Sequence, residues 1–262
     1  MPDLAIYGPW ALVAGGSEGV GAEFATQLAD DGFNLVLLAR KPGPLEETAA
    51  ACRERGVDVR TLSVDLTSPT AVAQVVELTE GLEVGLLVYN AGANSYGEPF
   101  TRGELSGHQG VIDLNITTML ALVHHYAQPM KDRGRGGILL VGSLAGYVGA
   151  SHEAIYGAVK AFGRIFAEGL WVELKEYGVD VLELVLGVTR TPAMERAGLD
   201  FSMPGLVVSE PADVAREGLA HMADGPVHVI SGNEKIVEMR GTADRATLVA
   251  KTDERLKRLV GH

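Results

Sequence analysis

The sequence predicts a single α/β domain with a doubly wound, seven-stranded parallel sheet and helices on both faces. Its 262 residues suffice for one such domain with a complete core. Apolar runs of strand length recur along the chain and alternate with helical patterns. Runs such as L-V-L-L-A and G-L-L-V-Y are apolar at every position, which is typical of strands buried on both faces of a parallel sheet. No repeat, low-complexity tract or linker divides the chain, so residues 1–262 are expected to form one domain.

Each predicted strand is a short apolar run between helix or turn signals. The seven strands are predicted at Trp10–Ala14, Asn34–Ala39, Asp58–Val64, Val84–Asn90, Gly137–Gly142, Val179–Leu186 and Val227–Ile230. Among the helices, S-P-T-A-V-A-Q-V-V-E-L places Pro69 near the first helical position, where proline is tolerated. Two longer amphipathic helices are expected at about Leu105–Arg133 and Ile155–Tyr177.

Composition excludes several classes of function. Twenty-two basic against thirty-four acidic residues give a net charge of −12, which argues against nucleic acid or an anionic membrane as a main partner. The single cysteine, Cys52, is expected to be a buried, unreactive thiol. No signal peptide or run of about 20 apolar residues is evident, so a cytoplasmic protein is expected. No cluster has metal-ligand spacing, and the adjacent His124 and His125 point about 100° apart on a helix; no metal site is predicted.

A glycine-rich turn follows the first predicted strand. G-G-S-E-G-V-G runs from Gly15 to Gly21 and leads into a helical stretch that ends at Gly32. Glycines let the backbone approach a phosphate, and a helix N-terminus offers free N–H groups and partial positive charge. The spacing Gly15-x-x-x-Gly19-x-Gly21 differs from the usual G-x-G-x-x-G, so the turn alone fits either a tight helix entry or a dinucleotide site.

A second pattern indicates proton-transfer chemistry. Tyr156 and Lys160 are four residues apart, which places them on one helix face, and Ser143 lies thirteen residues before the tyrosine. A phenol ionises near pH 10, but a neighbouring ammonium favours the phenolate and lowers its pKa. Such a tyrosine, lysine and serine can pass a proton to or from a carbinol oxygen.

The segment after the sixth strand breaks the alternation of strands and helices. Residues 189–209, here called the lid segment, mix apolar residues with Pro and Gly. A long irregular insertion at the carboxyl end of a strand is usually functional. We expect a mobile lid over the substrate; a plain surface loop is the alternative.

Taken together in this order, the motifs identify a resemblance to the single-domain short-chain dehydrogenases/reductases. The resemblance covers nearly the whole chain and implies a Rossmann-like fold. Its motifs are A-G-G-S-E-G-V-G (14–21), Asp65-Leu66, Y-N-A-G (89–92), Asn115 in D-L-N-I, Ser143 in G-S-L-A-G, the pair Tyr156/Lys160, and L-G-V-T-R-T (186–191). Three positions depart from the family pattern: Ala14, Tyr89 and Leu186 stand where threonine, asparagine and proline are usual.

The resemblance implies a role for each matching residue. Tyr156 would be the acid/base, Ser143 would bond the substrate oxygen, Lys160 would bind the nicotinamide ribose and lower the tyrosine pKa, and Asn115 would hold a water of the proton relay. The residues expected to contact a dinucleotide are Gly15, Ser17, Glu18, Gly19, Val20, Gly21, Arg40, Asp65, Leu66, Asn90, Ala91, Gly92, Tyr156, Lys160, Val188 and Thr191.

Cofactor preference is expected to be set after the second strand. An acidic residue there would bind the ribose hydroxyls and repel a 2′-phosphate. The chain has Ala39 followed by Arg40 and Lys41, and a guanidinium binds phosphate well. NADP(H) is therefore favoured and NAD(H) remains possible, with Glu18 opposing the phosphate and Ser17 able to add a hydroxyl.

The expected activity is interconversion of a small-molecule ketone or aldehyde and an alcohol. The alternatives are a ketoacyl-thioester reductase, with Arg190 and Arg196 beginning a basic docking patch, and a non-catalytic dinucleotide sensor. Asn94, Ser95, Tyr96 and His152 are expected at the lip of a partly apolar pocket. Large apolar residues on 155–177 favour a homo-oligomer, a tetramer or dimer, with Phe166 or Trp171 at a subunit contact.

Overall fold

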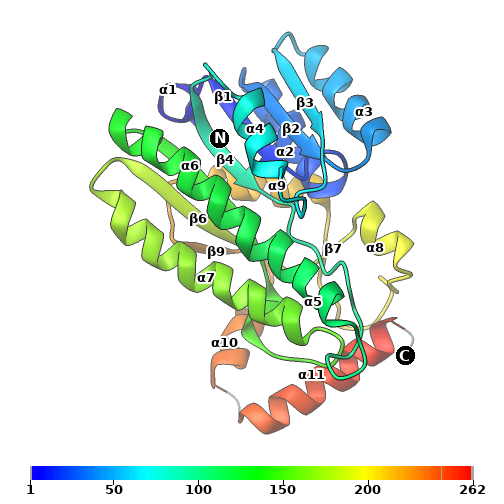
Figure 1. Ribbon diagram of the computed structural model, residues 1–262. Coiled ribbons are helices and arrows are strands. Elements are labelled where there is room, and N and C mark those ends of the chain that lie inside the picture. The colour runs from blue at the N-terminus through cyan, green and yellow to red at the C-terminus, as the bar shows by residue number, and fades with distance from the viewer. Residues whose placement is uncertain (1, 243, 261–262) are drawn as a thin grey trace.

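Seven parallel strands form the central sheet of the computed structural model, which describes residues 2–242 and 244–260 (Figure 1). Neighbouring strands pair in parallel register throughout, in the spatial order β3-β2-β1-β4-β5-β6-β9. The doubly wound fold is thereby confirmed, and all seven predicted strands are present within two residues at each end. Their bounds are β1 (Trp10–Ala14), β2 (Asn34–Ala39), β3 (Val59–Ser63), β4 (Val84–Tyr89), β5 (Gly136–Ser143), β6 (Val179–Leu186) and β9 (Val227–Val229).

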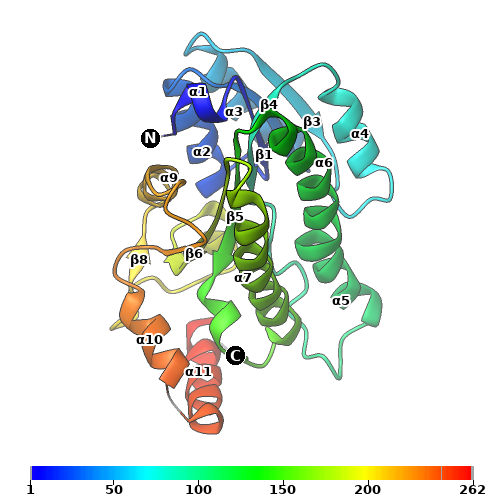
Figure 2. The ribbon, with the colours of Figure 1, turned by 90° about the vertical axis from the view of Figure 1, so that its left-hand side faces the viewer.

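Helices cover both faces of the sheet, as Figure 2 shows edge-on. One face packs against α2 (Gly19–Asp30), α3 (Pro42–Arg53) and α9 (Pro211–Ala220), and buries Phe24, Leu28 and Leu37 completely. The other face packs against α4 (Ala71–Leu78), α6 (Thr118–Arg133) and α7 (Ala154–Lys175). Because the central strands are covered on both faces, their side chains are apolar at nearly every position. Cys52 lies in α3 and is fully buried, as expected.

Two helix predictions need correction. The helix expected over Leu105–Arg133 is interrupted: α5 (Leu105–Ile112) leads into a π-helical turn, Asp113–Thr117, before α6 begins. One extra residue in a turn leaves the apolar pattern intact, so sequence periodicity does not reveal it. Pro69 is not at the first helical position either, because α4 begins at Ala71 with Thr70 as its N-cap.

The lid segment contains more regular structure than an irregular loop. It begins and ends in two short parallel strands, β7 (Val188–Thr189) and β8 (Val208–Ser209), and carries the short helix α8 (Pro192–Arg196). Beyond it lie α10 (Glu234–Thr242) and α11 (Arg245–Val260), at the same end of the molecule as α8 (Figure 1). A short N-terminal helix, α1 (Leu4–Tyr7), and a 3₁₀ turn, Leu144–Tyr147, complete the elements that matter below.

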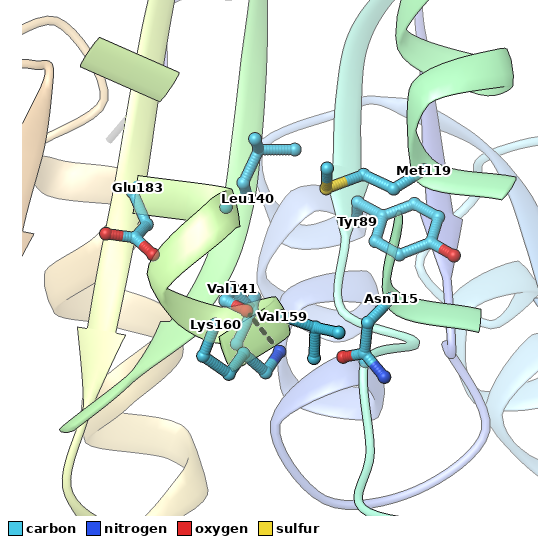
Figure 3. Close-up of a pocket in the computed structure, with 10 residues that line it drawn as sticks. Tyr89, Asn115, Met119, Leu140, Val141, Val159, Lys160 and Glu183 are labelled. Atoms are coloured by element: carbon cyan, nitrogen blue, oxygen red, sulfur yellow. Dashed lines mark hydrogen bonds between the residues drawn. The ribbon is translucent and has the colours of Figure 1, made fainter. Parts of the chain in front are cut away.

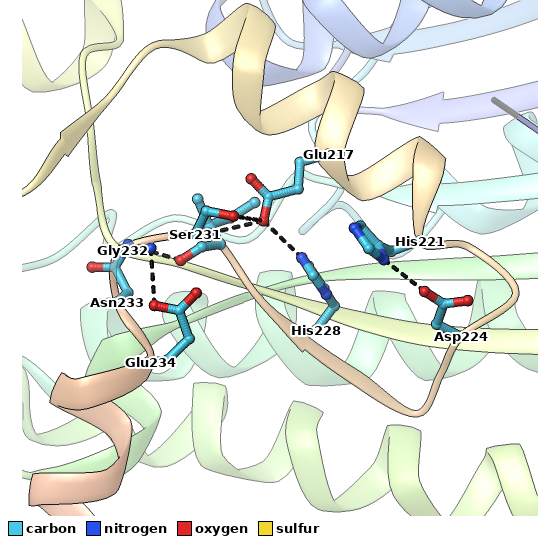
Figure 4. Close-up of polar contacts among 9 residues, drawn as sticks. Glu217, His221, Asp224, His228, Ser231, Gly232, Asn233 and Glu234 are labelled. Carbon is cyan, nitrogen blue, oxygen red and sulfur yellow. Dashed lines mark hydrogen bonds and ion pairs between the residues drawn. The ribbon is translucent and has the colours of Figure 1, made fainter.

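A polar network joins α9 to the chain that follows the edge strand β9 (Figure 4). Glu217 accepts hydrogen bonds from the backbone and hydroxyl of Ser231, at 2.8 Å each, and is 2.7 Å from the ring of His228. Burial alone would raise the pKa of Glu217, but these bonds outweigh it and lower the pKa. Just beyond, the buried Asn233 packs against Gly187, where a β-carbon would lie 2.5 Å from its Oδ1 atom. The network therefore supports the chain where β6 ends and the lid segment begins.

The large apolar residues of α7 divide into two sets. Phe166, Leu170 and Trp171 are partly buried against the core, and whether Phe166 or Trp171 lies at a subunit contact stays a prediction. Ile165, Val172 and Phe162 project further, with 58%, 66% and 37% of their surface exposed. Within the described residues, no helix is long and apolar enough to cross a bilayer.

Candidate active site

The carboxyl ends of β1, β4, β5 and β6 bring the predicted site residues to one edge of the sheet. The glycine-rich turn follows β1, Asn90 follows β4, Ser143 ends β5, and Val188 follows β6. Asn90 donates from Nδ2 to the Gly15 carbonyl at 2.9 Å and so ties the glycine turn to β4. In an open parallel sheet this edge is where ligands bind.

The glycine turn has a backbone that only glycine adopts easily. Gly15 and Gly19 have φ angles of 83° and 57°, in the left-handed region. A β-carbon on Gly21 would lie 1.9 Å from the Gly15 carbonyl oxygen, so this glycine permits α2 to start directly against the turn. Ser17 and Val20 lie in the same turn and first helical residues, and the Ser17 carbonyl accepts a hydrogen bond from Thr48.

The N-terminus of α2 keeps its N–H groups available. Its N-cap, Glu18, makes no capping hydrogen bond with its side chain. A twelve-residue helix with uncapped N–H groups beside a glycine turn suits a phosphate group. The turn therefore fits the pyrophosphate of a dinucleotide.

Tyr156, on α7, lies close enough to Ser143 for the serine side chain to favour its ionised form. Ser143 Oγ accepts from the Ala145 amide at 3.1 Å, which leaves its own proton free to donate to the tyrosine oxygen. Burial raises the pKa of Tyr156 to about 12, and the Ser143 side chain only partly opposes this. The expected lowering by Lys160 is not seen, because the Lys160 ammonium donates to the Val141 carbonyl at 2.9 Å and lies 5.6 Å from the tyrosine ring centre.

Lys160 and Asn115 lie near each other in the pocket of Figure 3, and both approach Gly92. A β-carbon on Gly92 would lie 2.5 Å from both the Lys160 Nζ and the Asn115 Oδ1 atoms. Both side chains are buried, and Asn115 Oδ1 has no hydrogen-bond partner among the described residues. Burial lowers the pKa of Lys160 to about 8, while a nearby carboxylate, Glu183, opposes the shift. Gly92 is thus required by the close approach of two predicted proton-relay side chains.

The π-helical turn and Tyr89 together position Asn115. Asn115 Nδ2 donates to the Val111 carbonyl at 2.9 Å and to the Ala93 carbonyl at 3.1 Å, which joins the turn to the chain after β4. Tyr89 replaces an asparagine of the family pattern, and its buried hydroxyl donates to the Leu114 carbonyl at 2.5 Å. This departure from the pattern adds a direct link between β4 and the residue before Asn115.

The residues predicted to read the adenosine end are gathered around the end of β2. Arg40 and Lys41 are exposed there, and the Arg40 charge helps to lower the pKa of Asp65, after the larger effect of the bonds from Thr67. Leu66 is buried, and its carbonyl accepts a hydrogen bond from Thr118 at 2.6 Å. Two exposed cations therefore stand where an acidic residue would select NAD(H).

The lid segment contacts the glycine turn through an ion pair that the sequence did not reveal. Arg196 on α8 binds Glu18 with both guanidinium nitrogens, one contact being Nη1 to Oε2 at 3.0 Å, and Lys41 lies 4.0 Å from the same carboxylate. These bonds lower the pKa of Glu18. Thr191, the N-cap of α8, packs over Gly19, where a β-carbon would lie 3.1 Å from its methyl group.

The expected basic patch on the lid segment does not form. Arg196 is paired with Glu18, and Arg190 is paired with Glu210 at 3.1 Å while it stacks on Phe201. Both cations are neutralised locally by carboxylates.

The predicted lip residues meet across two loops. His152 Nδ1 lies 2.9 Å from the Gly97 carbonyl, and the Asn94 amide is 3.5 Å from the His152 carbonyl. Tyr96 instead packs edge-on against the buried ring of His108, with ring centres 5.0 Å apart, and its hydroxyl accepts from the Glu104 amide. Ser95, between them, is exposed. Their place at the lip of a substrate pocket stays a prediction.

Glu183, in the middle of β6, is a buried carboxylate that the sequence analysis missed. The available signal was a charged residue within the otherwise apolar run V-L-E-L-V-L. Its side chain reaches the same cavity as Lys160 and Asn115 (Figure 3). Elsewhere, no group of three His, Cys, Asp or Glu side chains in the described chain is placed to hold a metal ion.

Comparison with known proteins agrees with this arrangement. Residues 9–200 match the family model for short chain dehydrogenase. The 7beta-hydroxysteroid dehydrogenase of Clostridium sardiniense is 30% identical over 247 residues, which cover 94% of each chain. The very-long-chain 3-oxoacyl-CoA reductase of Neurospora crassa is 33% identical over 81% of this chain and 64% of its own. A short-chain dehydrogenase from Sphingobium yanoikuyae, solved in complex with NADPH, is 33% identical and superposes with a TM-score of 0.78 over 92% of this chain and 94% of its own.

The family model covers well over half of the chain, the relatives reach across both the nucleotide-binding half and the Tyr156 helix, and the strand order is that of a Rossmann-like dehydrogenase. The chain therefore belongs to the short-chain dehydrogenase/reductase family and is an oxidoreductase.

Proposed function

We propose that this protein is an NADP(H)-linked reductase that interconverts a ketone or aldehyde and the corresponding alcohol. The observation that carries the proposal is the convergence of four side chains at one sheet edge. Ser143 ends β5 and lies beside Tyr156, and Lys160 meets Asn115 at Gly92, three residues after β4. A proton donor, a positioning hydroxyl and a buried cation are what carbonyl reduction requires.

Each side chain has a distinct part in the reaction. A bound nicotinamide supplies the hydride that goes to the carbonyl carbon. The Tyr156 hydroxyl gives its proton to the substrate oxygen, and Ser143 hydrogen-bonds that oxygen and Tyr156. Because burial raises the pKa of Tyr156 to about 12, the tyrosine is fully protonated at neutral pH and ready to act as an acid. Lys160 returns a proton to the phenolate.

The cofactor would be held by the residues that form the turn and the sheet edge. The glycine turn and the α2 N-terminus would bind the pyrophosphate, and Asn90, Ala91 and Gly92 would line the nicotinamide half. Arg40 and Lys41 would bind a 2′-phosphate, with Asp65 and Leu66 beside the adenine. The remaining contacts fall to Ser17, Glu18, Val20, Lys160, Val188 and Thr191.

We propose NADP(H) over NAD(H) because the only acidic side chain near Arg40 in the glycine turn is already neutralised. Glu18 would repel a 2′-phosphate as a free carboxylate, but Arg196 and Lys41 surround it. The relative from Sphingobium yanoikuyae was solved with NADPH, which supports the same preference.

The substrate is proposed to be a bulky apolar carbonyl compound. The names of the two relatives refer to a hydroxysteroid and to a very-long-chain 3-oxoacyl-CoA. The lid segment also presents exposed apolar side chains, Met194 and Val207, that a large apolar ligand would cover. Closure of residues 189–209 over such a ligand is part of the proposal.

A screen of bulky ketones and their alcohols with NADPH and NADH tests the function. Oxidation or reduction of nicotinamide would be followed by absorbance, with Tyr156→Phe as the negative control. Turnover of ketosteroids or large cyclic ketones with NADPH is expected. Cofactor binding without turnover of any carbonyl compound would instead favour a non-catalytic dinucleotide sensor.

Reduction of a ketoacyl thioester is the second candidate, favoured by the similarity to the Neurospora crassa enzyme. A 3-oxoacyl-CoA and a ketosteroid, compared under the same conditions, separate the two. A kcat/KM at least tenfold higher for the thioester would establish the second candidate.

We also propose that the protein assembles as a homo-oligomer, a dimer or tetramer, through α7. Ile165 and Val172 are large apolar residues that the chain itself leaves uncovered, and Phe162 stacks beside Phe166 with ring centres 6.0 Å apart. Exposed apolar residues on one long helix usually mark an interface.

A further inference from the structure

Glu183 lies at the centre of β6, where neighbouring strands cover it on both sides. Only 2% of its surface is exposed, and its Oε2 atom has no hydrogen-bond partner among the described residues. An unpartnered buried carboxyl is costly and is rarely retained without a role. Among the described residues Glu183 has no ion-pair partner, and Arg164 on α7 instead pairs with Glu168 at 3.3 Å and stacks on Tyr147.

Two glycines make room for this carboxyl. A β-carbon on Gly142 of β5 would lie 2.4 Å from Glu183 Oε1, and one on Gly163 of α7 would lie 3.8 Å from it. The side chain is therefore accommodated between the strand that ends in Ser143 and the helix that carries Tyr156 and Lys160.

Glu183 shares a cavity with the predicted proton-relay residues (Figure 3). The cavity has a volume of about 20 Å³ and is lined by Glu183, Lys160, Asn115 and Gly92, with Tyr89, Met119 and Val159 among its apolar walls. That volume admits one water molecule, and a buried water needs two to four polar partners. The Lys160 ammonium and the orphan oxygens Asn115 Oδ1 and Glu183 Oε2 provide them.

The charged groups that face Glu183 come from two elements. Lys160 and Arg164 on α7 favour the ionised form of Glu183, whereas Glu168 on the same helix disfavours it. The Glu183 charge in turn helps to raise the pKa of Tyr147, on the 3₁₀ turn after β5. Burial outweighs these charges and raises the pKa of Glu183 to about 8. Glu183 and Lys160 therefore both change charge within the range in which an enzyme works.

We propose that Glu183 is a positioning residue that acts through Lys160: it stores the proton that recharges Lys160, and its carboxylate then stabilises the Lys160 ammonium. The inference rests on the proposed function. After Tyr156 gives its proton to the substrate oxygen, Lys160 returns one toward the phenolate and becomes a neutral amine. The Glu183 carboxyl releases its proton across the cavity to that amine, and the carboxylate regains a proton from solvent before the next turnover. Each proton lost is replaced, and no oxidant or reductant beyond the hydride donor is needed.

The first test needs no substrate. Glu183→Gln keeps the shape of the side chain but removes its titration, and Glu168→Gln removes an exposed carboxylate from the same neighbourhood. Because the folded-state pKa of Glu183 is raised above its unfolded value, the parent loses stability as pH rises from about 4.5 to about 8. The melting temperature of Glu183→Gln relative to the parent should therefore rise between pH 5 and pH 8, while Glu168→Gln follows the parent. A constant difference would overturn the proposal.

The second test uses the pH profile of kcat with any carbonyl compound that the parent reduces. Without the Glu183 carboxylate, the Lys160 pKa should fall, so the alkaline limb should move about one unit lower and kcat at pH 8 should drop about tenfold. At pH 6 the loss should be under threefold, KM should change little, and Glu183→Asp should recover part of the limb. An equal loss at every pH would indicate a purely structural residue.

Two further outcomes are decisive. If Glu183→Gln does not fold, carbon-13 NMR of glutamate-labelled parent replaces it, and a parent without a carboxyl that ionises above pH 7 would overturn the proposal. In the other outcome, the melting temperatures follow the expected pH dependence but the parent reduces no carbonyl compound. That result would overturn the proposed function and the relay, whereas proton storage by Glu183 would stand.

Discussion

Arg196, on a helix of the lid segment, forms a bidentate ion pair with Glu18 of the glycine-rich turn, 178 residues away in the sequence. The contact places a cation of the lid segment onto the one acidic side chain of the glycine-rich turn. If the turn binds phosphate as proposed, Arg196 would offset the repulsion between Glu18 and a phosphorylated cofactor.

Arg196→Ala should weaken NADPH binding more than NADH binding. The substitution leaves Glu18 as a freer carboxylate near Arg40, so a 2′-phosphate should bind about two- to fivefold less tightly, the scale of an exposed ion pair. Fluorescence titration of both cofactors measures this. Arg190→Ala is the matched control, since that arginine lies on the same segment but pairs with Glu210.

The companion substitution Glu18→Gln should counteract the loss of NADPH binding that Arg196→Ala causes. In the double variant the carboxylate is absent, so loss of Arg196 should have little further effect on NADPH binding. If Arg196→Ala and Glu18→Gln act independently, the pair does not control phosphate binding.

Arg40→Asp should shift preference from NADP(H) toward NAD(H). The exposed guanidinium would be replaced by a carboxylate that repels a 2′-phosphate and suits a ribose diol. The ratio of the two dissociation constants should change by at least about tenfold. Arg53→Asp on α3 makes the same change in net charge farther along that helix and should leave the ratio unaltered. An unchanged ratio in Arg40→Asp would mean that the phosphate is bound elsewhere.

Tyr156→Phe should retain the fold and cofactor affinity but lose about 10²- to 10⁴-fold in kcat, the usual contribution of a positioned acid/base. The phenylalanine keeps the packing of the ring and removes the hydroxyl that lies beside Ser143. Tyr177→Phe, at the surface, serves as the control. Near-parental turnover by purified Tyr156→Phe would show that another group protonates the substrate.

Tyr89→Phe should destabilise the protein by about 1 kcal/mol and also reduce kcat. Its hydroxyl bonds the Leu114 carbonyl in the π-helical turn, directly before Asn115, so removal should loosen both. Tyr126→Phe removes a buried bond to Thr79 outside the site, and should lower stability without a matching loss of kcat. Denaturant unfolding and steady-state kinetics distinguish the two. Equal kinetic effects would show that Tyr89 does not position Asn115.

The sequence predicted the elements whose signals are local. All seven strands were found because parallel strands buried on both faces are continuous apolar runs. Ser143 lies at the end of β5, and α7 and the π-helical turn bring Tyr156, Lys160 and Asn115 near it. The π-helical turn around Asn115 was missed because one inserted residue hardly changes the apolar period. The pairing of Glu18 with Arg196 has no local signal at all, since it depends on how α8 folds back over the glycine turn.

Glu183 had a signal in the sequence that the sequence analysis did not use. A glutamate in a fully apolar strand run indicates either a sheet edge or a buried charge, and β6 is not an edge strand because β9 pairs with it. The expected effect of Lys160 on the Tyr156 pKa is the opposite case, because the sequence carries no signal for where the ammonium lies. A helix spacing of four brought Tyr156 and Lys160 to one face, but the direction in which the ammonium turned, toward Val141, followed from the packing around it.

Ile165→Glu should convert a homo-oligomer into smaller species while leaving the fold intact. Ile165 is 58% exposed on α7, so a charge there costs the monomer little but would be buried without a partner in a subunit interface. Multi-angle light scattering at micromolar concentration measures the state, and circular dichroism confirms the fold. Leu4→Glu, at 42% exposure on α1, is the control that should not change the mass. Trp171→Glu is a less specific test because that ring also packs against the core of its own subunit. A monomeric parent, or an Ile165→Glu variant with unchanged mass, would contradict assembly through this face of α7.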